Sequence, residues 1–233
     1  MSDRGDLWAH RVLRLAFVIL CIRIFPHAGT LLADYLPVDR WSPLWDVIHH
    51  GVQLLLTLGV MMFLSRSLSL RDIGFNLNHA SWSLKCSGVF AIIWIAGVVV
   101  WVLFIGTDLN PHIGEILYSF TLEGLSEELL FRAFVIGMLH PVFAHTFPLL
   151  RKGISVAGII SIVLFALAPL AIVFDPFSIS YVDPLVQLLT ICFALMYAIM
   201  FEYSHSLLGP VLVHNLSNGI LLLVIYLFRL FGA

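Results

Sequence analysis

Apolar residues occur in long runs along most of the chain, and short segments rich in polar residues, proline and glycine separate the runs. A run of about 20 apolar residues is long enough to cross the hydrocarbon core of a membrane as a helix. The runs predict seven such helices, near residues 9–25, 43–64, 83–105, 116–139, 153–173, 184–203 and 206–231. We therefore predict an all-α fold, a polytopic transmembrane helix bundle of about seven spans that forms a single integral membrane domain over residues 1–233.

The composition agrees with a membrane protein and excludes several classes of function. Of the 233 residues, 61% are hydrophobic and 11% are charged, which is far from the balance of a soluble domain. The formal net charge is −2 and no run of Lys and Arg is present to neutralise phosphates, which argues against a nucleic-acid partner. The three cysteines lack CxxC spacing, so they predict neither a disulfide framework nor a thiolate metal site. The expected surrounding of the chain is the lipid bilayer.

Basic residues are unevenly distributed among the connections, and this predicts the orientation of the bundle. They lie before or within the start of the first span, around the second connection and in the fourth connection: Arg4, Arg11, Arg14, Arg66, Arg71, Lys85, Arg151 and Lys152. Short cytoplasmic loops carry an excess of Lys and Arg, so we expect these connections and the N-terminus to be cytoplasmic. The first apolar run has no small-x-small cleavage site, and we expect it to be the first helix rather than a removable signal peptide.

Three charges lie inside the fourth predicted span, in the stretch LSEELLFRAF over residues 125–134. Each of Glu127, Glu128 and Arg132 costs at least a few kcal/mol in hydrocarbon, so such residues are expected to face protein or water and to have a function. Glu128 and Arg132 are spaced i, i+4 and can form an ion pair on one helix face. Glu127 lies roughly 16 Å into the span, near the middle of the membrane. A structural network that only holds helices together is the simpler alternative for these charges.

The seventh span carries polar residues at matching depth, in the stretch LVHNLSNGI. His214 and Asn218 are i, i+4 on one face, and Asn215 and Ser217 lie to the sides of that face. The helix runs opposite to the fourth span, and the two residues lie roughly 12 and 18 Å from its start. The depth of these residues therefore permits a single polar site in which His214 and Asn218 meet Glu127 and Arg132 across the bundle.

These two stretches resemble the motifs of a known family. EELLFR matches the EExxxR motif, and His214 with Asn218 matches the HxxxN motif, of the CPBP family (CAAX proteases and bacteriocin-processing enzymes, also called ABI), which are glutamic-type intramembrane proteases. The resemblance covers a catalytic core of about residues 116–222. It implies that Glu127 is the general base that activates water, that Glu128 and Arg132 structure the site, and that His214 and Asn218 stabilise the oxyanion.

The resemblance also implies partners, cofactors and location. It implies an endopeptidase that hydrolyses a peptide bond of a membrane-associated protein or peptide, without an organic cofactor. Zinc stays open, and the sequence defines neither the substrate's own sequence nor an oligomeric state. Together with the compact size, the resemblance implies a prokaryotic plasma membrane.

One motif of the family is altered in this chain. The FxxxH motif aligns with Phe165, but Pro169 stands where the histidine belongs. A proline cannot activate water, although it deprives the carbonyl of Phe165 of its helical donor, and a water could be held there. This change supports an alternative, in which a catalytically impaired relative binds a peptide or partner protein, as immunity-type members are proposed to do.

Two further alternatives concern other residues. A small proton-coupled transporter would use Glu127 and His214 as a relay, but the sequence shows no inverted repeat. Asp46, His49 and His50 are spaced i, i+3 and i+4 near the outer end of the second span and could ligate a metal. Interfacial residues within reach of water are the simpler interpretation of that group.

Overall fold

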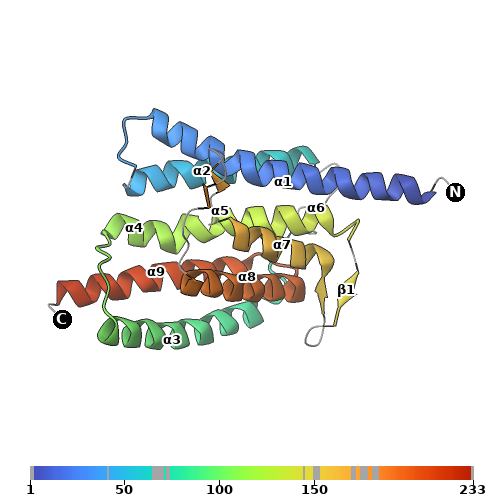
Figure 1. Cartoon of the computed structure of the whole chain (residues 1–233). Coiled ribbons are helices and arrows are strands. Elements are labelled where there is room, and N and C mark those ends of the chain that lie inside the picture. The colour runs from blue at the N-terminus through green and yellow to red at the C-terminus, as the bar shows by residue number, and fades with distance from the viewer. Residues whose placement is uncertain are drawn as a thin grey trace.

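The computed structural model of the chain describes residues 3–40, 42–64, 71, 74–143, 145–148, 153–168, 172–173, 178–179 and 184–231. It confirms the predicted all-α bundle, whose helices run along a common direction (Figure 1). Five helices are long and apolar enough to cross a membrane: α1 (Asp3–Tyr35), α2 (Pro43–Leu64), α3 (Ala80–Phe104), α8 (Pro184–Ser204) and α9 (Leu208–Leu230). A shorter apolar helix, α7, covers Val156–Leu167.

The fourth predicted span is a continuous helical rod that changes its type of turn along its length. It consists of α4 (Ile113–Tyr118), the π-helix η1 (Ser119–Glu123), α5 (Gly124–Glu128), the π-helix η2 (Leu129–Ile136) and α6 (Gly137–Leu139). We call these residues, 113–139, the central rod. All eight residues of η2 are buried, and the rod lies between α1 and α2 on one side and α8 and α9 on the other (Figure 1). Arg132, which lies on η2, is therefore surrounded by protein.

Two short antiparallel strand pairs accompany the helices. Strand β1 (Thr146–Phe147) pairs with β2 (Ile154–Ser155), which leads directly into α7. Strand β3 (Ile172–Val173) pairs with β4 (Ser178–Ile179), between α7 and α8.

The first helix is longer than predicted. The sequence predicts its end near residue 25, before the FPHAGT segment, but α1 continues through Pro26 to Tyr35. A proline removes only its own donor, and the neighbouring groups stay helical because unpaired backbone groups are costly in lipid. Gly29 also favours the longer helix, since a Cβ there would lie 2.3 Å from the backbone oxygen of His49. The small residue lets α1 pack closely against α2.

The fifth helix is shorter than predicted. The sequence predicts a span over 153–173, but α7 ends at Leu167 and residues 172–173 form a strand instead. The carbonyl of Phe165 accepts a hydrogen bond from the N–H of Ala168 at 3.1 Å, so a tighter turn replaces the helical donor that a proline at position 169 cannot supply. Helices often tighten their last turn in this way, and a proline shortly beyond the end prevents further helix. Pro169 itself lies outside the described residues, as do Arg66, Arg151 and Lys152.

Candidate active site

The buried ion pair of the central rod joins it to two other helices. The Nε of Arg132 lies 3.2 Å from Oε2 of Glu128, and both side chains are completely buried. The other two guanidinium nitrogens donate to Oγ of Ser161 on α7 at 3.2 Å and to the carbonyl of Ala194 on α8 at 3.3 Å. The i, i+4 pairing predicted from the sequence is thus formed. Its burial requires both partners, because either charge alone would be strongly destabilising.

Aromatic rings enclose the same guanidinium. Its central carbon lies 4.8 Å from the centre of the Phe165 ring and 5.7 Å from that of Tyr197. Cations in such positions are attracted by the ring faces. Phe165, the aromatic residue of the altered motif, therefore lines the polar cluster from α7.

His214 lies between the two adjacent glutamates of the rod. Its Nδ1 is 2.9 Å from Oε1 of Glu128, and its Nε2 is 3.8 Å from Oε2 of Glu127. The ring stacks on Tyr197 with centres 5.0 Å apart and an interplanar angle of 14°. The side chain of Glu128 is completely buried, whereas 29% of the Glu127 side chain is exposed. Glu127 is therefore the more exposed carboxylate of the pair.

Two hydroxyl groups support the backbone of α9 next to His214. The Ser217 hydroxyl donates to the carbonyl of His214 at 2.7 Å, and the Tyr197 hydroxyl lies 3.2 Å from the same serine oxygen. From α3, the indole N–H of Trp94 donates to the carbonyl of Ser217 at 2.7 Å. Since Ser217 donates its proton to His214, it accepts from Tyr197. These bonds fix the ring that stacks on His214.

Asn215 joins α9 to the point where η1 passes into α5. Its side-chain oxygen accepts from the N–H of Gly124 at 2.9 Å, and its side-chain nitrogen donates to the carbonyl of Thr121 at 3.0 Å. A π-helical turn interrupts the regular backbone ladder, and inside a membrane its polar groups need other partners. A Cβ on Gly124 would lie 2.4 Å from the Asn215 oxygen and 2.9 Å from Cβ of His214. The glycine thus allows the close approach that brings His214 to the glutamates.

Asn218 does not join the cluster directly. It is half-buried, and its side-chain oxygen lies 3.3 Å from Oγ of Ser217, whose proton is donated to the carbonyl of His214. The structure brings four of the five predicted site residues into mutual contact: Glu127, Glu128, Arg132 and His214. Asn218 lies one helical turn beyond His214 on α9, and the bonds to the central rod are made by Asn215 instead.

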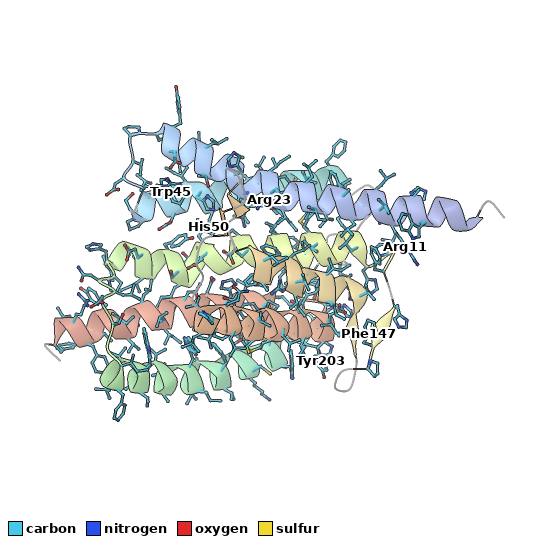
Figure 2. All side chains as sticks on the ribbon, viewed as in Figure 1. Arg11, Arg23, Trp45, His50, Phe147 and Tyr203 are labelled. Carbon is cyan, nitrogen blue, oxygen red and sulfur yellow. The ribbon has the colours of Figure 1, made fainter. Side chains whose placement is uncertain are left out.

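Helix α2 also contributes to the site, although the sequence did not predict that α2 contacts the central rod. His50 points from α2 toward the central rod, where its Nδ1 lies 2.7 Å from Oγ of Ser126 (Figure 2). His49 turns the other way: its Nδ1 lies 3.2 Å from Oγ1 of Thr30 on α1, and its ring stacks on Trp45. The two rings lie 4.7 Å apart, edge to face, but their hydrogen bonds go to different helices. Within the described residues, no group of three or more His, Cys, Asp or Glu side chains is placed to hold a metal.

Several side chains that shape the site were not predicted to belong to it: His50, Ser126, Ser161, Trp94, Tyr197 and Asn215. Each of them takes part in a hydrogen bond between two different helices, so its contribution depends on how the helices pack. Of these, Asn215 had one indication, because it directly follows His214 on a helix expected to face the glutamates.

A comparison with protein families bears on this geometry. The sequence model of the family described as "Type II CAAX prenyl endopeptidase Rce1-like" matches residues 109–220. Over these residues the chain is similar to this Rce1-like family. The match confirms the resemblance found in the EExxxR and HxxxN motifs, and it contains the whole central rod, α7, α8 and the part of α9 that carries His214. No curated protein and no solved structure matches the chain.

The Rce1-like match begins at residue 109, after α1, α2 and α3. His50, on α2, therefore lies outside the matched residues. The family match and the long apolar helices support an integral membrane protein that is similar to a protease family. The contact of His50 with Ser126 is observed in this structure and is not part of the family match.

Proposed function

We propose that the protein is an intramembrane endopeptidase that uses Glu127 to activate the hydrolytic water. The match to the Rce1-like family model supports protease activity of the CAAX type in general. The observation that carries the finer proposal is the division of roles between the two adjacent glutamates. Glu128 is buried and occupied by Arg132 and His214, whereas Glu127 is partly exposed beside His214.

The reaction follows from these positions. Glu127 takes one proton from a water molecule as the water oxygen attacks the carbonyl carbon of the substrate. The carbon–nitrogen bond then breaks, and the same proton passes to the departing amine nitrogen. One water is consumed, and a new carboxyl group and a new amino group are formed. A cavity that admits water is required, since water is otherwise absent at this depth.

His214 and Asn218 are the proposed donors to the oxyanion. With a proton on each ring nitrogen, His214 binds Glu128 through Nδ1 and offers the Nε2 proton to the developing negative charge. The half-buried amide of Asn218, one turn further along α9, is the second proposed donor. Glu128 and Arg132 hold His214 in this orientation without touching the substrate.

The substrate proposed is a membrane-associated protein or peptide, and the plasma membrane of a prokaryote, with the N-terminus in the cytoplasm, is the proposed location. The test uses purified protein in liposomes and internally quenched peptides that end in a CAAX sequence, with and without a farnesyl group. We expect Glu127→Gln to lower the cleavage rate by about 100-fold or more, because the base is lost.

A matched control is available on the same rod. Glu115 accepts a hydrogen bond from the N–H of His112 at the start of α4, and Glu115→Gln keeps an acceptor there. This control variant should cleave at the wild-type rate. Equal rates for wild type and Glu127→Gln would overturn the proposal.

Two alternative functions are outcomes of the same experiment. Pro169, at the place of the motif histidine, favours a catalytically impaired relative that binds a peptide or partner. That alternative predicts retention of the farnesylated peptide without cleavage. A proton-coupled transporter predicts proton flux into the liposomes, lost in Glu127→Gln, and no cleavage.

A further inference from the structure

His50 is an ionisable side chain at the proposed site that the mechanism above does not use. Helix α2 packs against α5 and η2, and His50 extends from it toward the central rod (Figure 2). Its ring lies 5.5 Å from that of Tyr118 on α4 and 2.7 Å, through Nδ1, from Oγ of Ser126. Ser126 directly precedes Glu127 in the chain. His50 thus enters the proposed site from a helix outside the family match.

The hydrogen bonds of Ser126 determine which nitrogen of His50 carries the proton. The Ser126 hydroxyl donates to the carbonyl of Glu123 at 2.9 Å, so its single proton is already used. Toward His50 the serine oxygen is therefore an acceptor, and Nδ1 of His50 must be the donor. In the neutral ring, Nε2 then has the free lone pair.

This lone pair is available for a further hydrogen bond. No hydrogen bond between described residues uses Nε2 of His50, and the side chain is half-buried rather than enclosed. His214, by contrast, has both ring nitrogens directed at carboxylates. His50 therefore offers an acceptor on the α2 side of the same polar cluster.

We propose that Nε2 of His50 accepts a hydrogen bond from the attacking water and orients it for proton removal by Glu127. This inference rests on the proposed function. The water has two protons: Glu127 removes one, and the other is held by His50 without transfer. The lone pair of the water oxygen is then directed at the substrate carbonyl, and His50 stays neutral throughout the step.

Two substitutions separate this role from a structural one. In His50→Asn, the amide nitrogen lies near the position of Nδ1 and keeps the bond to Ser126, but nothing replaces Nε2. In His50→Gln, the end of the longer side chain reaches the position of Nε2. We expect His50→Asn to lower kcat about tenfold or more with little change in KM, and His50→Gln to regain part of that loss. The control is His10→Asn at an exposed position of α1, which should keep the wild-type kcat.

A second readout is independent of turnover. Nitrogen NMR of the protein with labelled histidine should show a His50 ring protonated at Nδ1, and Ser126→Ala should weaken that preference. A ring protonated at Nε2 would overturn the inference, as would His50→Asn with full kcat in a wild type that cleaves. A wild type that cleaves no peptide would overturn the proposed function itself, and this inference with it.

Discussion

Arg132 shows how a charge is kept inside the bundle. It is among the largest completely buried side chains, and its charge is matched by Glu128 at 3.2 Å and by hydrogen bonds to α7 and α8. Breaking a buried ion pair by removing one partner leaves the other charge uncompensated, which costs about 3–5 kcal/mol. The residue is therefore expected to support the fold as well as the position of His214.

We predict that Arg132→Leu lowers the stability by about 3–5 kcal/mol and that thermal unfolding in detergent shows a clearly lower Tm. Arg229→Leu is the control, because Arg229 is near the end of α9 and donates to the carbonyl of Thr107 at an exposed position. Surface interactions of this kind are worth about 1 kcal/mol or less. A Tm of Arg132→Leu equal to that of the control would show that the ion pair does not stabilise the fold.

At the residue scale, the sequence was sufficient for the charged residues and insufficient for the amides. Glu127, Glu128 and Arg132 are conspicuous in an apolar run, and His214 lies at the predicted depth. Depth along a helix does not determine which face meets the neighbour. Asn215, placed to the side by ideal helix geometry, is the amide that bonds the central rod.

At the scale of elements, the central rod depends on close packing where η1 passes into α5. Gly124 lies against His214 and Asn215 of α9 with no room for a side chain. Apolar runs in the sequence predicted the helix correctly over most of its length. They could not predict the π-helical turns, because hydropathy reports burial and not the register of backbone hydrogen bonds.

We predict that Gly124→Ala separates α5 from α9, lowers the stability by about 1–3 kcal/mol and abolishes cleavage, because His214 moves away from the glutamates. Gly97→Ala on α3 is the control, since a Cβ there has no atom within 4 Å. Both variants can be compared by thermal unfolding and by the liposome assay. Wild-type cleavage in Gly124→Ala would contradict the proposed role of this contact.

The whole molecule raises the question of how many times the chain crosses the membrane. The termini lie at opposite ends of the bundle, as expected for an odd number of crossings (Figure 1). Helix α7 has 12 residues, or about 18 Å, which is shorter than the hydrocarbon core of about 30 Å. Its burial against η2 and α8 compensates for this length, because it faces protein on two sides.

We therefore predict that the N-terminus is cytoplasmic and that the C-terminus lies on the opposite side. Reporter fusions at Met1 and at Ala233, one active only in the cytoplasm and one only outside it, measure this directly. Both termini on one side would mean an even number of crossings and would contradict the arrangement of seven spans.

The site as a whole was only partly predictable at this scale. Two motifs about ninety residues apart indicated that the fourth and seventh spans meet, and the structure brings them together. The approach of α2 could not be inferred, because His50 belongs to no motif and its contact with Ser126 bridges 76 positions of the chain. Such contacts follow from the packing of the entire bundle.

The central claim, that Glu127 activates water to hydrolyse a peptide bond, is tested most directly by cleavage in water enriched in oxygen-18. Mass spectrometry of the peptide products should show one heavy oxygen in the new C-terminal carboxyl group with wild-type protein, and no product above background with Glu127→Gln. A heavy-oxygen product formed equally well by Glu127→Gln, or no product from the wild type with any of the peptides, would contradict the account.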